Sequence, residues 1–145
     1  MSIKEALINA NAIQVGVDCK DWKEVIAIAA KPLLVSGKIT DAYIEGIISS
    51  TIEHGAYYVL GEGVAIPHAR PECGALDTGF SMVILKTPIS IEGSEDVDIL
   101  VMFSAKDSNS HIQDGIKQIV EMLDDDTKLL SLRNATTVKE VVDLL

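Results

Sequence analysis

The chain has 145 residues, of which 22 are acidic, 12 are basic and 48% are hydrophobic, and its formal charge is −10 at pH 7. A chain of this length buries roughly two thirds of its unfolded surface without a metal or a disulfide, so we expect one domain over residues 1–145. The acidic balance and the scarcity of aromatic residues argue against a nucleic-acid-binding protein, because phosphate groups favour a basic surface.

The amino-terminal residues carry no pattern of an export signal. Residues 1–5 lack the basic and apolar segments of a signal peptide. The longest apolar run, Val25–Ala30, is far shorter than the roughly 20 residues that a membrane helix needs. We therefore expect a cytoplasmic protein that does not insert into a membrane. Cys19 and Cys73 form no Cys-x-x-Cys pair, so neither a disulfide nor a zinc site is predicted.

The first third of the chain shows helical spacing around one short strand. A helix is expected over residues 3–8 and a strand over residues 12–15. The next helix has its apolar residues at helical spacing, and Pro32 is expected to kink or end it; these residues are Trp22, Val25, Ile26, Ala29 and Leu33. Thr40 is the predicted cap of a further helix, and Gly55 suits the backbone after its last turn. The predicted inward face of that helix is Ile44, Ile47, Ile48 and Ile52.

The middle of the chain changes to the period of strands. Over residues 80–85 and 97–103, both alternating sets of side chains are largely apolar. This pattern is typical of strands that are covered by helices on both faces of a sheet.

Helical spacing returns in the last third of the chain. It runs from Ile112 to Leu123, with Ser110 and Gln113 at the separation of a capping box, and Thr137 repeats that signature before residues 138–145. Two blocks of helices therefore flank the strands. We predict an α+β fold, a three-layer α/β/α sandwich around a mixed sheet.

The three histidines differ in their surroundings. His54 lies in the last predicted turn of a helix, where a partly charged imidazole suits the negative end of the dipole, so a structural role is favoured. His111 follows Ser110 in the first turn of a helix, which is a place that binds anions. It is either part of an anion site or an ordinary residue of that turn.

His68 lies between two prolines, Pro67 and Pro71, so it is expected where the chain leaves a strand. Arg70, two residues further on, points to the same side of an extended chain. A nearby guanidinium lowers the pKa of an imidazole, which keeps the ring neutral and nucleophilic. The same guanidinium can bind a phosphoryl group through two parallel hydrogen bonds. The pattern leaves open a reactive His68 and an unreactive surface histidine.

The segment Gly63–His68 resembles the active-site motif of the mannitol/fructose-type IIA proteins of the bacterial phosphoenolpyruvate-dependent sugar phosphotransferase system. Further segments along nearly the whole chain resemble the ascorbate branch of that superfamily more closely. They are Gly55–Val59, Pro67–Glu72, Thr78–Ser81, Val97–Leu100 and Asp107–Gly115.

The resemblance implies a phosphocarrier with the IIA fold and no metal or organic cofactor. His68 would accept phosphate from the carrier protein HPr and pass it to a cysteine of a IIB protein, which serves a membrane IIC protein. His111 matches the second active-site histidine. Mannitol and fructose relatives usually have an Arg-Glu pair in the preceding helix, where this chain has Thr51–His54. We therefore assign the neutralisation of the phosphoryl group to Arg70.

Several alternatives remain open at this point. The same fold serves as a regulatory phosphoacceptor that is not coupled to transport. A metal site built from the three histidines has no recognisable ligand spacing, and a nucleophilic Cys73 has no apparent orienting group. L-Ascorbate as the transported compound rests on the resemblance alone, and the pattern also leaves a homodimer open.

Overall fold

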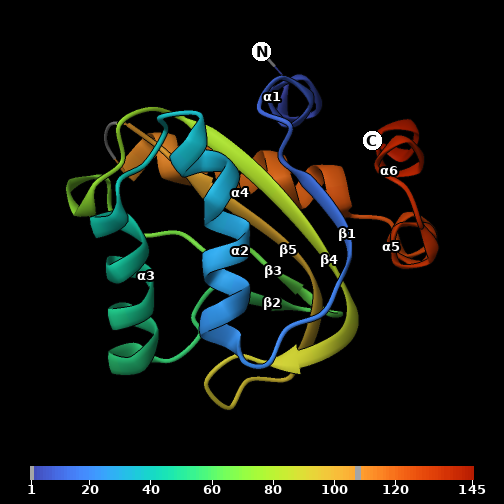
Figure 1. The fold of residues 1–145 in the computed structure, drawn as a ribbon, viewed down its shortest axis with the longest axis horizontal. Coiled ribbons are helices and arrows are strands. Elements are labelled where there is room, and N and C mark those ends of the chain that lie inside the picture. The colour runs from blue at the N-terminus through green and yellow to red at the C-terminus, as the bar shows by residue number, and fades with distance from the viewer. Residues whose placement is uncertain (1, 107–108) are drawn as a thin grey trace.

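A mixed β-sheet organises the computed structural model, which describes residues 2–106 and 109–145 but not the side chains of residues 109–111. The strands described are β1 (Ile13–Val17), β2 (Val59–Gly61), β3 (Val64–Ala65), β4 (Gly79–Ser90) and β5 (Asp96–Ser104). They lie in the order β1-β4-β5-β3-β2, and Figure 1 shows this sheet between the helices. The β1–β4 and β3–β5 pairs are parallel, whereas β4–β5 and β2–β3 are antiparallel. The predicted mixed sheet is confirmed.

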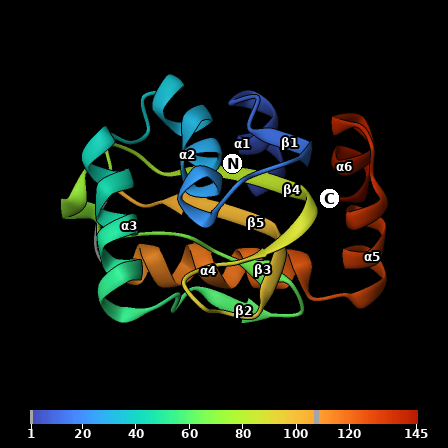
Figure 2. The same cartoon turned by 60° about the horizontal axis from the view of Figure 1, so that its bottom comes forward.

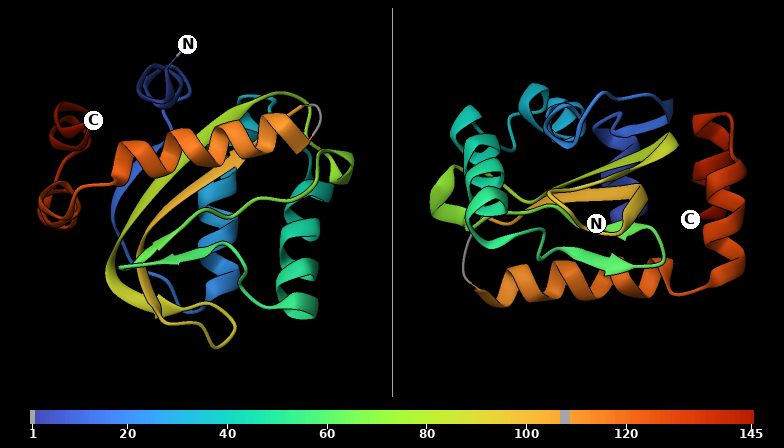
Figure 3. Two further views of the ribbon diagram at one scale, coloured as in Figure 1. Left: turned by 180° about the vertical axis from the view of Figure 1, so that it is seen from behind. Right: turned by 90° about the horizontal axis from the view of Figure 1, so that it is seen from below.

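Helices cover both faces of this sheet. They are α1 (Ile3–Asn9), α2 (Trp22–Val35), α3 (Asp41–His54), α4 (Asn109–Leu123), α5 (Asp126–Asn134) and α6 (Val138–Leu144). Helices α2 and α3 lie on one face and α4 crosses the other, as Figures 2 and 3 show from two directions. Two apolar cores result, one under α2 and α3 and one shared by α1, α4, α5 and α6. The predicted three-layer α/β/α sandwich is confirmed.

Strand β4 shows why both of its faces are apolar. Phe80, Met82 and Ile84 enter the core under α4, whereas Val83 and Leu85 enter the core under α2 and α3. Successive side chains of a strand point to opposite faces, so a strand between two helical layers must be apolar at both parities. The sequence pattern of residues 80–85 has this cause.

We expected Pro32 to kink or end helix α2, and the helix does not end there. It continues to Val35 with the proline inside its last turns. A proline lacks the N–H that would bond to the carbonyl four residues earlier, that of Ile28. The side-chain amide of Gln14 donates to this carbonyl instead, at 2.9 Å from Nε2 to the oxygen. The lost bond is thus replaced from β1, and the helix continues.

The inward face of α3 agrees with the prediction at Ile47, and partly at Ile44 and Ile48, but differs elsewhere. Tyr43, Ile47 and Thr51 are fully buried, whereas Ile52 is 55% exposed. The two polar side chains are buried because their hydroxyls are bonded: Tyr43 to the carbonyl of Phe103, and Thr51 to the carbonyl of Ile47. The buried face of α3 therefore includes two residues with hydroxyl groups, Tyr43 and Thr51, which the spacing of purely apolar residues does not predict.

The ends of α3 are close to the prediction. Thr40 is its N-cap residue, but the hydroxyl donates to the carbonyl of Gly74 at 3.1 Å instead of capping the helix. Gly55 follows the last turn with a φ of +83°, as its predicted position requires.

Three other helical details complete the comparison. Thr137 caps α6 and accepts a hydrogen bond from the N–H of Glu140, as predicted. Helix α4 begins at Asn109, one residue before the predicted cap Ser110, whose side chain lies outside the described set. Helix α5 was not predicted. Among the described residues, none of the helices combines the length and apolarity that a membrane crossing needs.

Candidate active site

The segment that carries His68 runs along β5. Strand β3 pairs in parallel with β5, through Val64 opposite Ile99 and Ala65 opposite Leu100. The N–H of Phe103 then donates to the carbonyl of Pro67 at 3.2 Å, beyond the end of β3. The chain therefore leaves the sheet directly before His68, as the two prolines predicted.

The ring of His68 is held in one orientation. Its Nδ1 lies 2.7 Å from the carbonyl oxygen of Ile66. A carbonyl oxygen can only accept, so Nδ1 carries the hydrogen and the lone pair of the neutral ring is on Nε2. Partial burial lowers the pKa of His68 from its ordinary value, and the bond to Ile66 opposes this shift. The ring is therefore neutral at pH 7, with Nε2 as its nucleophilic atom.

From the sequence we expected the guanidinium of Arg70 to lower the pKa of His68. The direction is the same, but burial of the ring is the larger cause, and Arg70 does not contribute to the shift. Arg70 is an exposed residue whose charge is screened by water, which explains its weak effect on the free imidazole.

Two aromatic rings enclose the imidazole of His68. The ring of Phe103 lies 5.4 Å away between centroids and is tilted, and the ring of Tyr57 lies 5.6 Å away with its plane nearly perpendicular. The Tyr57 hydroxyl also donates to the backbone carbonyl of His68, at 2.7 Å. Tyr57 thus contacts both the ring and the backbone of the histidine.

The residue after His68 is tied to the buried side of the molecule. The N–H of Ala69 donates to the hydroxyl of Tyr43 at 3.0 Å, and that hydroxyl donates to the carbonyl of Phe103 at 2.8 Å. Helix α3, the His68 loop and the end of β5 are thereby joined at one buried group. This arrangement restricts the movement of the loop, which a group that must react in one geometry requires.

A cavity of about 480 Å³ opens beside His68. It is lined by Ser50, His54, Tyr57, His68, Ala69, Arg70, Cys73 and Ile112. Arg70 therefore lies at the same cavity as His68, as their spacing predicted. Helix α3 supplies Ser50 and His54, and α4 supplies Ile112, so residues far apart in the sequence meet here.

His111 lies in the first turn of α4, directly before Ile112. Its side chain lies outside the described residues, and its predicted role is taken up below as a proposal. The backbone already places the start of a 15-residue helix at this cavity. The free N–H groups of such a terminus favour anions.

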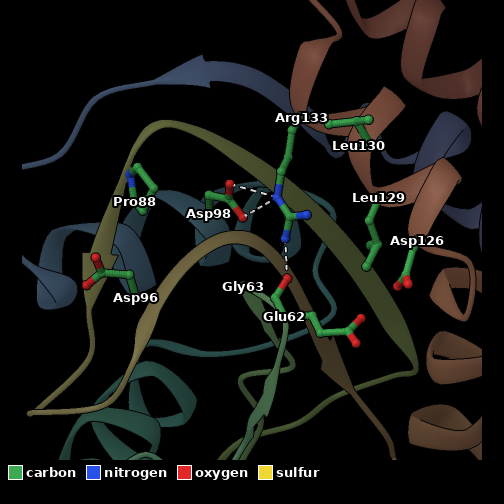
Figure 4. Close-up of a pocket in the computed structure, with 9 residues that line it drawn as sticks. All are labelled: Glu62, Gly63, Pro88, Asp96, Asp98, Asp126, Leu129, Leu130 and Arg133. Carbon is green, nitrogen blue, oxygen red and sulfur yellow. Dashed lines mark hydrogen bonds and ion pairs between the residues drawn. The ribbon is translucent and has the colours of Figure 1, made fainter.

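A second cavity, of about 550 Å³, lies between the β2–β3 turn and α5 (Figure 4). Its charged side chains are Glu62, Asp96, Asp98, Asp126 and Arg133. The guanidinium of Arg133 is already bonded to Asp98, at 2.8 and 2.9 Å, and to the carbonyl of Glu62. Asp126 raises the pKa of Glu62. The residues that line this acidic cavity include no histidine or cysteine, and its carboxylates would repel a phosphoryl group, so we place the chemistry in the cavity beside His68.

Sequence reasoning missed three members of the His68 cavity. Ser50 and His54 are four residues apart on α3 and so lie on one helix face, a signal that the sequence contained. Tyr57 follows this helix in a turn, and its spacing from His68 indicates no contact. In the described part of the chain, no group of three His, Cys, Asp or Glu side chains is placed to hold a metal ion.

Known proteins resemble this chain over its whole length. Residues 6–145 match the model of the family described as phosphoenolpyruvate-dependent sugar phosphotransferase system, EIIA 2. The ascorbate-specific PTS system EIIA component of Salmonella choleraesuis is 35% identical over all of this chain and 96% of its own length. That of Escherichia coli K12 is 33% identical over the same shares.

Two solved structures are also similar. The mannitol-specific cryptic phosphotransferase enzyme IIA of Escherichia coli is 36% identical, with a TM-score of 0.87 over 99% of this chain and 97% of its own. The IIA mannitol enzyme of Escherichia coli, solved in complex with phosphorylated IIB, is 25% identical, with a TM-score of 0.79 over 93% and 94%. The chain belongs to the EIIA 2 family of the phosphoenolpyruvate-dependent sugar phosphotransferase system and is a phosphotransferase component of that system.

Proposed function

We propose that this IIA component carries the phosphoryl group on Nε2 of His68. The observation that supports the assignment is the bond from Nδ1 to the carbonyl of Ile66, which leaves Nε2 as the nucleophile. The lowered pKa of His68 keeps this nitrogen unprotonated at pH 7. The adjoining cavity of about 480 Å³ leaves room for a phosphoryl group and for the side chain that delivers it.

The reaction is an in-line transfer without a separate proton donor. The bond from Nε2 of His68 to phosphorus forms as the bond from phosphorus to the donor nitrogen breaks. Nδ1 keeps its hydrogen, which stays hydrogen-bonded to the carbonyl oxygen of Ile66. The phosphorylated ring is therefore an imidazolium, and the dipole of that carbonyl group stabilises its positive charge. When a thiolate later attacks the phosphorus, the ring leaves as the neutral imidazole from which the cycle began.

Catalysis of this kind consists of positioning and of stabilising the charge on the phosphoryl oxygens. We propose that Arg70, His111 and the N-terminus of α4 supply that stabilisation. Arg70 lines the cavity, and Ile112 brings the first turn of α4 to it. The mechanism needs no metal ion or organic cofactor.

We further propose that phospho-HPr is the donor and that a cysteine of a IIB protein is the acceptor. The support for IIB comes from the related IIA mannitol enzyme, which was solved in complex with phosphorylated IIB. The IIB protein would then phosphorylate the compound that a membrane IIC protein transports. All of these exchanges draw on phosphoenolpyruvate, so we expect them in the cytoplasm.

L-Ascorbate is the proposed substrate of the transport system. The curated relatives that are 33–35% identical over the full chain are named ascorbate-specific. The similarly related cryptic enzyme is named mannitol-specific, so a direct comparison is needed. In cells that lack their own IIA of each type, we expect this chain to restore uptake of labelled ascorbate. Restoration of mannitol uptake alone would contradict the assignment.

The decisive test of the phosphocarrier is intact mass after incubation with phosphoenolpyruvate, enzyme I and HPr. We expect a gain of one phosphate that is labile in acid, as a phosphoramidate is. His68→Ala should abolish the gain, and His111→Ala should retain it at a lower rate. A wild-type chain that gains no phosphate, or a His68→Ala chain that still does, would overturn the proposal.

A regulatory role without transport is less well supported. The nitrogen regulatory IIA protein of Neisseria meningitidis is only 16% identical, so it shares the fold alone. The sequence identity to the ascorbate-specific and mannitol-specific relatives, 35% and 36%, is about twice as high.

A further inference from the structure

The cavity beside His68 is also lined by His54, which has no role in the mechanism proposed for His68, Arg70 and His111. His54 lies in the last turn of α3 and lines the cavity with Ser50, one turn earlier on the same helix face. The sequence favoured a structural role for His54 at the end of the helix dipole. The structure confirms its place in the last turn and shows that it also lines the cavity beside His68.

Among the described residues, His54 has only a weak ionic partner. Its Nε2 lies 3.7 Å from a carboxylate oxygen of Glu53, and both side chains are largely exposed. An exposed ion pair at this distance contributes little to stability, because water screens it and both side chains must be ordered. The imidazole is therefore available to another anion.

A phosphoryl group on His68 would add roughly two negative charges to this cavity. Among the described residues that line it, Arg70 and His54 are the groups besides His68 that can carry a positive charge. They come from different elements, since Arg70 follows the His68 loop and His54 ends α3. The other polar residues that line this cavity are Tyr57, Ser50 and Cys73.

We infer that His54 is a phosphoryl-binding residue, which donates a hydrogen bond to the phosphoryl group on His68 and neutralises part of its charge. The inference rests on the proposed function of His68. Because the charge on the equatorial oxygens develops during transfer, a donor placed there in advance accelerates the reaction. The same contact shields the phosphohistidine from water and so lengthens its lifetime.

The test compares His54→Gln with His54→Arg, and uses Glu53→Gln as the matched control on the neighbouring exposed residue. The two measurements are the rate of phosphorylation by phospho-HPr and the half-life of phospho-His68. Glutamine can still donate a hydrogen bond but carries no charge, so we expect His54→Gln to slow phosphorylation by about tenfold, because a charge-assisted hydrogen bond is roughly twice as strong as a neutral one. His54→Arg should restore much of the rate, and Glu53→Gln should leave it within about twofold.

A direct readout distinguishes binding from a structural effect. On phosphorylation of His68, the ring nitrogen signals of His54 in ¹⁵N NMR should shift to those of a protonated imidazole that donates a hydrogen bond. Circular dichroism should show that every variant is folded, since His54 is exposed.

The outcomes separate this inference from the proposed function. If His54→Gln is phosphorylated at the wild-type rate with the wild-type half-life, His54 does not bind the group, although His68 remains the carrier. Slowing without rescue by His54→Arg, or without a change in the His54 signals, would also overturn the inference. Absence of phosphorylation in the wild-type chain would instead overturn the function of His68 itself.

Discussion

At the scale of single residues, the chemistry depends on how His68 is buried. Its ring is enclosed by Phe103 and Tyr57, and its Nδ1 is bonded to Ile66. Enclosure removes water, which disfavours the charged form of the ring, and the bond to Ile66 determines which nitrogen is free. Neither effect requires a charged neighbour.

The lowered pKa of His68 leads to a prediction about pH. The Cε1–H signal of His68 in NMR should titrate with a midpoint below 6.5, the ordinary value for histidine. The same signal in urea-unfolded chain should titrate near 6.5. Phosphoryl transfer should therefore persist as the pH falls past 6.5 and decline only at the lower midpoint.

The sign of the effect on stability follows from the same shift. Between the folded and the unfolded pKa, the unfolded chain binds more protons than the folded chain. The contribution of His68 to the free energy of unfolding is therefore complete above pH 6.5 and decreases as the pH falls toward the lower value. A midpoint at or above 6.5 in the folded chain would contradict both statements.

Tyr57 gives a second prediction at this scale. Tyr57→Phe keeps the ring beside the imidazole but removes the bond from its hydroxyl to the His68 carbonyl. We expect phosphorylation by phospho-HPr to slow by several-fold, because the loop that holds Nε2 in position is loosened. The free energy of unfolding should fall by about 1 kcal/mol or less.

Tyr58→Phe is the matched control. Tyr58 is the residue next to Tyr57, and this change removes its buried hydrogen bond to the hydroxyl of Thr51, at 2.7 Å. We expect a loss of about 1 kcal/mol of stability with an unchanged rate of phosphoryl transfer. If the two variants affect the rate equally, Tyr57 has no specific role in positioning His68.

At the scale of elements, α4 approaches β5 through Gly115. A Cβ atom at this position would lie 2.5 Å from Cε2 of Phe103. That ring cannot move aside freely, since it is stacked on Phe80 and contacts His68. The glycine therefore sets the distance between α4, whose first turn reaches the cavity, and the strand behind His68.

Gly115→Ala should consequently reduce both stability and transfer. In an exposed helix the change would stabilise by about 1 kcal/mol. Here overpacking costs about 1–3 kcal/mol, so we expect a net decrease in the urea midpoint and slower phosphorylation. Gln118→Ala, on the exposed side of the same helix, should leave both unchanged. A more stable Gly115→Ala chain would show that α4 can shift without cost.

At the scale of the whole molecule, Arg133 connects parts of the chain that are far apart in sequence. From α5 it bonds to Asp98 on β5 and to the carbonyl of Glu62 in the β2–β3 turn, as Figure 4 shows. These partners are 35 and 71 residues away. The contact attaches the carboxyl-terminal helices to the sheet near the strand that leads to His68.

Arg133→Met should lower the free energy of unfolding by about 1–3 kcal/mol, since it leaves the carboxylate of Asp98 without its charged partner. The two side chains are only 29% and 16% exposed, so water compensates for little of this loss. Urea unfolding measures the change. Lys139→Gln breaks the exposed pair with Asp143 and should change stability by less than about 0.5 kcal/mol. Equal effects of the two variants would contradict this account.

The amino-acid sequence by itself determined most of the elements and the place of His68 at the exit of a strand. The doubly apolar strands around Met82 and Val101 predicted a sheet with helices on both faces, and the prolines beside His68 predicted a strand exit. These features could be predicted because each depends on the conformation of a few consecutive residues. The missed α5 has only two fully buried leucines, Leu129 and Leu132, so its pattern is weak.

Only the tertiary structure decided which distant residues meet. Gln14 sustains α2 at Pro32, the buried face of α3 includes Thr51, and His54 reaches the cavity of His68. None of these follows from local periodicity. In the order β1-β4-β5-β3-β2, the short β3 lies beside β5. The helices cover the two apolar faces of the sheet that this order forms. Hydrogen bonding between strands far apart in the sequence, and the burial of apolar faces against them, therefore assembled the site.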